Sequence, residues 1–227
     1  MYQTRLQTIN IPNTHSLLIR TLMDRQQYWD PNGDAARQGI GSALWSFFGV
    51  LWPSSIYLAD HMAARPVQAG ERILEIGCGL ALPSLVCHRQ GADITASDRH
   101  PLAHRFLRKN LHLNDLPITL PYRHGGWGET PSNDEPPLTG RYDMIIGSDL
   151  LYDRDAPQAL AGFIARHAYS HSQVWIVDAN RGHHATFTRQ LTEHGFDHVG
   201  QVCLNRDPCL SGVRRYRGRL LKYRRMG

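Results

Sequence analysis

Short apolar runs alternate with helical patterns along the chain from residue 72 onward. The runs are rich in branched side chains, and the segments between them carry apolar residues at helical spacing. Such alternation favours a parallel sheet with helices on both faces, because right-handed crossovers carry the chain from strand to strand. The expected strands are residues 72–78, 93–98, 118–123, 142–149, 173–179, 198–204 and the final basic segment, and the expected helices are residues 56–64, 82–90, 101–114, 157–170 and 184–195.

The last two expected strands are joined by a different kind of connection. Residues 206–212, RDPCLSG, are turn-like and too short for a crossover helix, which predicts an antiparallel hairpin. The fold class is therefore α/β: a Rossmann-like, doubly wound sheet of about seven strands, mostly parallel, with an antiparallel C-terminal hairpin. Residues 1–50 do not follow the alternation, and we expect them to form an N-terminal extension packed on a single globular unit, residues 51–227.

Composition limits the class of protein. The 227 residues are 41% hydrophobic, enough for one sizeable core, and the four cysteines lack CxxC spacing, which indicates a reducing, cytoplasmic environment. The N-terminus lacks the charged and apolar regions of a secretory signal. Residues 38–59 carry no charge and have the length of a membrane span. Because they include Pro53 and several Ser and Gly, we expect a buried protein segment and no membrane partner.

Positive charge is concentrated near the C-terminus. The net charge is +5, and residues 213–226 carry seven Lys or Arg and no acid. Such a segment is compatible with a nucleic-acid surface, but an edge strand whose charge blocks unwanted pairing is the favoured interpretation. The 13 histidines show no metal-ligand spacing, so no metal site is expected.

A glycine-rich turn, LEIGCGLALPSL at residues 74–85, follows the first expected parallel strand. Doubly wound sheets bind ligands at the carboxyl ends of their strands, and Gly77 and Gly79 let the backbone approach a ligand closely. The turn lacks the Lys of a nucleotide-triphosphate loop. A dinucleotide motif would have a third glycine where Leu82 stands, whereas S-adenosylmethionine (SAM) has no pyrophosphate and does not need one.

Two carboxylates accompany this turn. Asp98 lies 21 residues past Gly77, at the end of the second parallel strand, where a carboxylate can accept hydrogen bonds from both ribose hydroxyls. This spacing suits NAD as well as SAM, so the residues alone leave both cofactors open. Glu75 interrupts an apolar strand next to the turn, and a charge there needs a partner, which places it with the cofactor-binding residues.

Four features together resemble class I SAM-dependent methyltransferases and, more narrowly, the family-16 branch of seven-β-strand enzymes, known mainly for protein lysine methylation. The features are VLWPSSIYLADHM (50–62), the glycine turn with Ser97 and Asp98, Trp127 in GGWGE, and YDMIIGSDLLYD (142–153). The last of these holds the D-x-x-Y pattern of that branch at Asp149 and Tyr152. The resemblance covers roughly residues 45 to 195. The chain departs from it at Leu80 and Ala81, where threonine and glycine are frequent, so we expect a slightly different turn.

The resemblance implies SAM as cofactor and a set of contacts to it. Trp127 would lie near the adenine, where an indole offers flat apolar contact, and Trp52 would close the methionine end, where an aromatic ring attracts a sulfonium. The implied SAM-binding residues are Trp52, Gly77, Cys78, Gly79, Asp98, Trp127 and Ser148.

The resemblance also implies two catalytic residues, Asp149 and Tyr152. A lysine nucleophile must first lose a proton, since its free pKa is about 10.4. Asp149 can orient the incoming amine and accept its proton, directly or through water. Tyr152 can form a wall of the channel for an aliphatic side chain. Asn180 and Arg181 follow the fifth parallel strand on the same rim, and we expect them to be polar loop residues.

The implied function is SAM-dependent N-methylation of a protein amine, in the first place a lysine side chain. An RNA or DNA methyltransferase is the alternative that the basic C-terminus supports, but the fourth parallel strand ends in SDLLY rather than the [DN]PP[YF] of enzymes that methylate base amino groups. A small-molecule amine methyltransferase, a SAM-binding module without catalysis and an NAD-dependent dehydrogenase also remain open.

Overall fold

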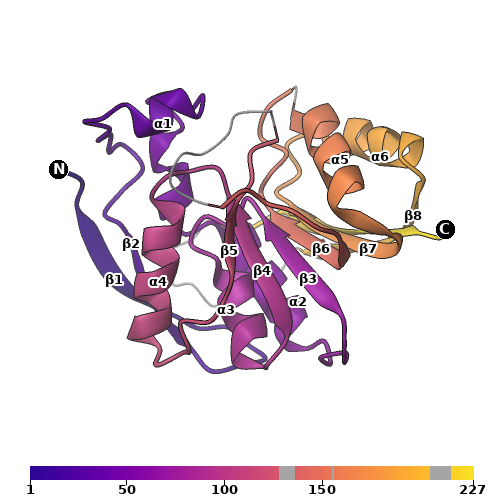
Figure 1. The fold of residues 1–227 in the computed structure, drawn as a ribbon, viewed down its shortest axis with the longest axis horizontal. Coiled ribbons are helices and arrows are strands. Elements are labelled where there is room, and N and C mark those ends of the chain that lie inside the picture. Colours follow the sequence, from indigo (N-terminus) through magenta and orange to yellow (C-terminus); the bar gives the residue numbers. More distant parts are fainter. Residues whose placement is uncertain (128–135, 155, 205–215) are drawn as a thin grey trace.

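A seven-stranded sheet forms the centre of the molecule (Figure 1). The structure, a computed structural model, describes residues 1–127, 136–154, 156–204 and 216–227. The strand order is β5-β4-β3-β6-β7-β9-β8; the first five strands are parallel, and β9 runs antiparallel to both of its neighbours. This confirms the predicted doubly wound α/β class and the C-terminal hairpin. The strands are β3 (Arg72–Ile76), β4 (Asp93–Asp98), β5 (Tyr122–His124), β6 (Tyr142–Ser148), β7 (Ala168–Asp178), β8 (Phe196–Leu204) and β9 (Gly218–Arg225).

Helices cover both faces of the sheet because successive strand residues point to opposite sides. Ile73 of β3 belongs to one buried cluster, with side chains of α2 (Pro53–Ala63), α3 (Leu82–Arg89) and α4 (Ala103–Leu113). The next residue, Leu74, belongs to a second cluster with α5 (Ala156–His167) and α6 (His184–Glu193). The sheet is therefore buried on both sides, as the near-continuous apolar runs of its central strands indicate.

Most predicted elements match, and the largest boundary differences are at the starts of β5 and β7. The strand expected at residues 118–123 is β5, which begins only at Tyr122. Residues 168–170, expected at the end of a helix, begin β7 instead, because Ala168 pairs with Tyr142 of β6. Pairing with a neighbouring strand decides that segment over its helical spacing. The expected helix stop at Gly91 is confirmed, since this residue has a φ of 81° directly after α3.

The N-terminal extension contains a β-hairpin that the sequence did not reveal, formed by β1 (Thr4–Ile9) and β2 (Leu17–Leu22). Its outer edge is held by α4, because Asn114 and Asn110 accept hydrogen bonds from the backbone N–H groups of Leu18 and Arg20, both at 2.8 Å. A short helix α1 (Asp34–Arg37) and a 3-10 helix η1 (Trp45–Gly49) follow. Side chains of the hairpin and η1 join the cluster under α2 and α3, so the extension packs on the same core.

The uncharged residues 38–59 contain η1 and the first part of α2. Trp45 and Phe48 of η1 and Ile56 and Leu58 of α2 are buried. In the part of the chain that the structure describes, no helix has the length and apolarity needed to cross a membrane.

The basic C-terminal strand is not an edge strand, so that interpretation was wrong. The chain returns after β8 and places β9 between β7 and β8, which makes β8 the edge. The basic side chains of β9 contact the fold itself: Lys222 lies over the Trp175 ring at 4.2 Å, and Arg225 donates to the backbone oxygen of His194.

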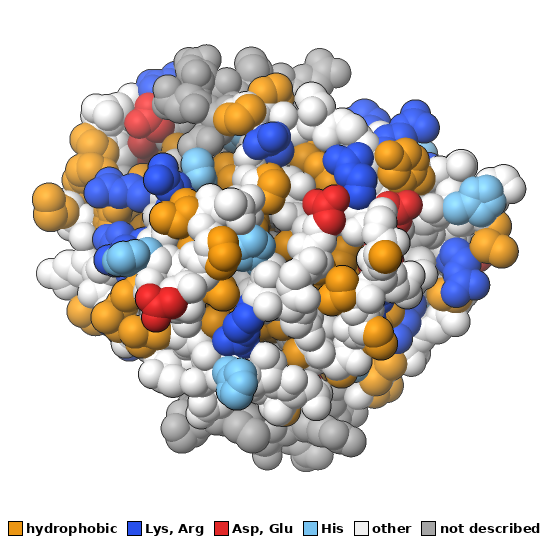
Figure 2. Space-filling model, turned by 60° about the horizontal axis from the view of Figure 1, so that its bottom comes forward, with side chains coloured by type: hydrophobic (Ala, Val, Ile, Leu, Met, Phe, Trp, Pro, Cys, Tyr) orange, Lys and Arg blue, Asp and Glu red, His pale blue; other side chains and the backbone are white. Residues whose placement is uncertain are grey.

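On the face in Figure 2, basic and acidic side chains are interspersed, and the drawn Lys and Arg do not form a continuous stripe. The predicted turn at 206–212 and part of the polar loop at 132–140 lie outside the described residues.

Candidate active site

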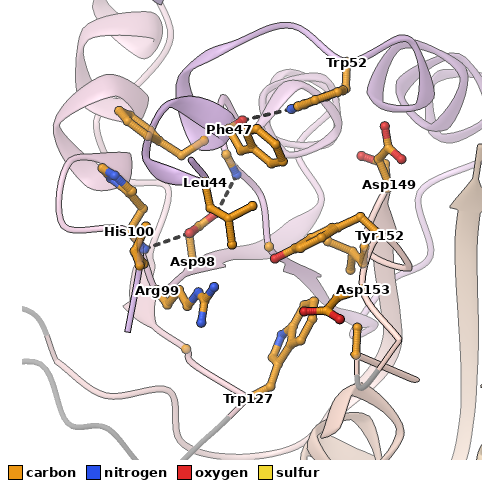
Figure 3. A pocket seen from close by; sticks show the side chains of 18 of the residues that line it. Leu44, Phe47, Trp52, Asp98, Arg99, His100, Trp127, Asp149, Tyr152 and Asp153 are labelled. Atoms are coloured by element: carbon orange, nitrogen blue, oxygen red, sulfur yellow. Dashed lines mark hydrogen bonds between the residues drawn. The ribbon is translucent and has the colours of Figure 1, made fainter. Parts of the chain in front are cut away.

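A cavity of about 320 Å³ lies at the carboxyl ends of the parallel strands (Figure 3). Its walls come from η1 and the residues on either side of it, the glycine turn after β3, the end of β4, the segments after β5, β6 and β7, and the start of α5. Eight of the ten predicted site residues line it: Trp52, Gly77, Gly79, Asp98, Trp127, Ser148, Asp149 and Tyr152. Glu75 and Cys78 are not among the described lining residues.

The glycine turn follows β3 in a conformation that few side chains tolerate. Gly77 and Gly79 have φ values of 55° and 51°, in the left-handed region. A Cβ at Gly79 would stand 2.9 Å from the backbone oxygen of Phe48, and one at Gly77 would stand 2.5 Å from a methyl carbon of Leu150. The glycines therefore let η1 and the segment after β6 close over the turn. Ala81, a residue that departs from the family pattern, also has a positive φ of 58°.

We expect Gly79→Ala to destabilise the protein by about 2–4 kcal/mol, because a left-handed φ costs an alanine roughly 1–2 kcal/mol and forced overpacking adds a similar amount. Urea unfolding measures this change. The matched control is Gly91→Ala, which has a φ of 81° but, in the described parts of the chain and apart from its chain neighbours, no heavy atom within 4 Å of the added Cβ. If both variants lose the same stability, the contact of the turn with η1 is not what requires glycine at position 79.

Asp98 at the end of β4 is the buried acid beside this turn. One carboxylate oxygen accepts a hydrogen bond from Gly79 N and the other from His100 N, both at 2.8 Å (Figure 3). Burial raises the pKa of Asp98, and the two backbone N–H donors lower it. Each carboxylate oxygen can accept a further hydrogen bond, so a diol at the cavity wall finds two acceptors held in place.

Glu75 lies under the turn instead of in the cavity wall. Its Oε2 accepts hydrogen bonds from the backbone N–H of Ser84, at 2.9 Å, and from the Ser84 hydroxyl. Burial raises the pKa of Glu75 from 4.5 to about 8, against the effect of the Ser84 donors. The side chain thus ties β3 to the first turn of α3. Cys78 is buried as well, and its backbone N–H donates to Ser97 O of β4.

Stability should fall as pH rises through the window set by Glu75. The folded carboxyl keeps its proton up to about pH 8, whereas the unfolded one ionises near 4.5, so folding is favoured less between these values. Between pH 5 and 9 the free energy of unfolding of the wild type should fall by an amount on the order of 2–4 kcal/mol, and we expect Glu75→Gln to abolish this decrease. Urea unfolding at both pH values, with the exposed Glu193→Gln as control, measures it. Parallel losses in all three proteins would exclude Glu75 as the cause.

Aromatic side chains form the wall beside the glycine turn. The Trp52 indole N–H donates to the backbone oxygen of Phe47 at 2.9 Å. The Phe47 ring centroid lies 5.3 Å from that of Trp52 and 6.2 Å from that of Tyr152. Sequence reasoning did not assign Phe47 to the site. The available signal was the uncharged, aromatic stretch 38–59, whose burial was predicted but whose place beside the turn depends on the tertiary fold.

Asp149, directly after β6, is the second buried acid of the cavity. Its backbone has a φ of 59°, and its N–H donates to Val177 O of β7 at 2.8 Å, which fixes where the side chain points. The carboxylate is 8% exposed and forms an ion pair of 2.8 Å with Arg181. Burial raises the pKa of Asp149, while Arg181 and a hydrogen bond with Ser54 lower it. Figure 3 shows this carboxylate between Trp52 and Tyr152.

Tyr152 projects into the cavity from the same segment as Asp149 (Figure 3). Burial raises its pKa, so its hydroxyl stays neutral at physiological pH. The charge of Arg99, a cavity residue that sequence reasoning did not assign, acts against this rise in the pKa of Tyr152. Trp127 and Ser148 line the same space, so the structure brings together side chains that follow β4, β5 and β6.

The described residues fit SAM. The cavity volume lies within the roughly 300–1,000 Å³ of small-molecule sites, and the cavity has aromatic walls for an adenine. The Asp98 carboxylate can accept further hydrogen bonds from a ribose diol. The cavity wall also includes the glycine turn, where Gly77 and Gly79 leave the backbone uncovered by any Cβ. When bound, SAM supplies a sulfonium methyl group for transfer to a nucleophile. Among the described residues, no group of three or more His, Cys, Asp or Glu could hold a metal ion.

Comparison with known proteins agrees with this geometry. A family model described as lysine methyltransferase matches residues 33–194, more than half of the chain. The chain belongs to this family. It is a SAM-dependent methyltransferase, so of the two cofactors that the glycine turn left open, SAM is the one it uses.

Individual relatives match different shares of this chain. EEF1A lysine methyltransferase 3 of Mus musculus is 26% identical over 70% of this chain and 68% of its own length. Histone-arginine methyltransferase METTL23 of Xenopus laevis is 31% identical over 45% of this chain, which spans only 44% of that protein. The solved magnesium protoporphyrin IX methyltransferase of Synechocystis PCC 6803 with bound SAM shares the fold, with a TM-score of 0.57 and 18% identity over 75% of this chain and 77% of that one.

Proposed function

We propose that this protein transfers a methyl group from SAM to a lysine side chain of another protein. The observation that carries the proposal is the buried Asp149 carboxylate, which shares an aromatic-walled cavity with the glycine turn and Asp98. An aliphatic amine chain fits between aromatic rings, and a carboxylate at its inner end can receive the amine. The lysine acceptor in the name of its relative EEF1A lysine methyltransferase 3 supports this choice of acceptor.

The cavity residues divide into a cofactor part and an acceptor part. Asp98 would hold the ribose, Trp127 would contact the adenine, and Trp52 would close the methionine end. Backbone groups of the glycine turn and the residue before Asp149 would complete the cofactor part. The residues proposed to hold SAM are Trp52, Gly77, Cys78, Gly79, Asp98, Trp127 and Ser148, with Glu75 supporting the turn from beneath.

The proposed acceptor part consists of Asp149 and Tyr152. Asp149 orients the amine by hydrogen bonding and accepts its proton, directly or through water. Tyr152 forms the wall along which the aliphatic part of the lysine lies, with Phe47 on the same side. Their main contribution is alignment, because methyl transfer is an in-line displacement that depends on the position of the nucleophile.

Methyl-labelled SAM tests this function. The purified protein is incubated with an extract from cells that lack its gene, after heating the extract to inactivate other methyltransferases. We expect label that protease removes and nuclease does not, recovered as methyl-lysine after acid hydrolysis. Acetylating the lysines of the extract beforehand is the control, and it should abolish labelling.

Other outcomes of the labelling would replace the proposal. Label in methyl-arginine would favour arginine as the acceptor, as in the name of histone-arginine methyltransferase METTL23. Label that nuclease removes would favour an RNA or DNA substrate and give the basic C-terminal residues a role. Label confined to small molecules would favour a free amine as the acceptor.

A further inference from the structure

Arg181 places a cation directly on the acceptor side of the cavity. One terminal nitrogen of its guanidinium lies 2.8 Å from Asp149 Oδ1, and its Cζ lies 5.8 Å from the centroid of the Trp52 ring. Arg181 is itself a lining residue and 36% exposed, whereas Asp149 is 8% exposed. The carboxylate that we assign to the acceptor therefore already has a partner of opposite charge.

This pairing matters because the acceptor must be uncharged. A lysine ammonium has no lone pair, and its free pKa is about 10.4, so nearly all of it is protonated at neutral pH. A lone buried carboxylate would stabilise the ammonium and hold its proton more tightly. A guanidinium remains protonated throughout the physiological range, so the carboxylate and Arg181 together carry almost no net charge.

We propose that Arg181 is a positioning residue that offsets the charge of Asp149, so that the acceptor lysine is held as the neutral amine. The inference rests on the proposed lysine methyltransferase function. On binding, the ammonium gives one proton to solvent and keeps its lone pair. That pair forms the new bond to the methyl carbon as the carbon–sulfur bond pair passes to sulfur, and the methylated nitrogen, now cationic, then gives a proton to Asp149, directly or through water. Until then Asp149 accepts a hydrogen bond from the amine.

Arg181 is the main positive charge that compensates Asp149, because its other close neighbours are acidic or neutral. Asp178 of β7 is a like charge, and its own pKa is raised by burial. Burial also raises the pKa values of Tyr152 and Tyr216, so both hydroxyls stay neutral in the range of the test. The other polar and charged groups that face this part of the cavity are Ser54, Arg99, Asp153 and Arg25. The Ser54 hydroxyl of α2 lies 2.8 Å from the Tyr216 hydroxyl, and the Arg25 Cζ lies 5.8 Å from the centroid of the Trp52 ring.

Two substitutions separate charge from shape. Arg181→Gln removes the cation and keeps a polar side chain, and Arg181→Lys restores a cation. The acceptor is the protein that takes most label in the heated extract, purified and added at saturating concentration. We expect the rising limb of the kcat–pH profile to move by about one pH unit to higher pH in Arg181→Gln. At pH 7.5 its kcat should be several-fold lower and should recover at high pH, whereas Arg181→Lys should follow the wild type.

A second measurement counts protons without turnover. With S-adenosylhomocysteine in place of SAM, acceptor binding at pH 8 should release up to about half a proton fewer from Arg181→Gln than from the wild type and Arg181→Lys. Coinciding pH profiles, or equal proton release in all three proteins, would overturn the inference. So would a loss of kcat that is the same at every pH, because Arg181 would then act on the fold or on SAM binding, which titration with SAM measures separately. A wild type that labels no protein would instead refute the proposed function.

Discussion

We expect Asp149→Asn to bind SAM as tightly as the wild type and to transfer methyl groups about 10²–10⁴-fold more slowly, the range that a positioned proton acceptor contributes. The carboxylate lies between Trp52 and Tyr152, where the amine is proposed to enter (Figure 3). Asparagine is the right replacement because it tolerates the left-handed backbone that Asp149 adopts, with a φ of 59°. Isothermal titration with SAM and the initial rate of labelling measure the two effects.

The control for Asp149→Asn is Asp153→Asn, which makes the same charge change four residues along in the wall of the same cavity. We expect this control to keep its transfer rate within a few-fold. Near-normal transfer by Asp149→Asn would refute the proposed role in receiving the amine. A large loss of SAM affinity would move Asp149 to the cofactor part of the site.

Asp98→Ala should weaken SAM binding by at least about a hundredfold. The two hydrogen bonds proposed from the ribose hydroxyls to the Asp98 carboxylate would be lost, and each bond to a charged group contributes roughly 1.5 kcal/mol or more. The substitution also leaves the N–H groups of Gly79 and His100 without their acceptor, which loosens the turn on which the cofactor is proposed to lie. Isothermal titration of SAM measures the affinity, and urea unfolding separates it from lost stability.

Asp93→Ala is the matched control for Asp98→Ala, since Asp93 stands at the opposite end of β4 and is exposed. Its SAM affinity should equal that of the wild type. If Asp98→Ala binds SAM normally, the ribose assignment is wrong, and the carboxylate serves only to hold the turn.

Local patterns predicted the elements of this fold well where the chain repeats strand and helix. The branched apolar runs, the helical spacing and the stop at Gly91 depend on neighbouring residues, so they can be read from short windows. The starts of β5 and β7 could not be predicted from short windows, because Tyr122 and Ala168 pair with residues of strands that are distant in the sequence. The hairpin of β1 and β2 was missed for a similar reason, since its edge is held by Asn110 and Asn114 of α4.

The candidate site divides in the same way. Gly77, Gly79 and Asp98 could be assigned from sequence because they end or closely follow parallel strands, whose carboxyl ends meet at one edge. Asp149 was assigned through the family resemblance, and it follows a parallel strand at the same edge. Glu75 was assigned to the cofactor site from its charge, but the structure turns it beneath the loop toward Ser84. Phe47, Arg99 and Arg181 could be assigned to the cavity only from the tertiary structure, because other segments of the chain pack beside them there.

By itself the sequence determined the doubly wound class, the antiparallel end of the sheet and the positions of the glycine turn and its acids, because these follow from residue spacing along single elements. Only the tertiary structure decided that β9 lies inside the sheet, that η1 covers the glycine turn, and that Arg181 pairs with Asp149. The physical reason is that burial, close backbone approach and charge pairing act between atoms that are near in space, whatever their separation along the chain.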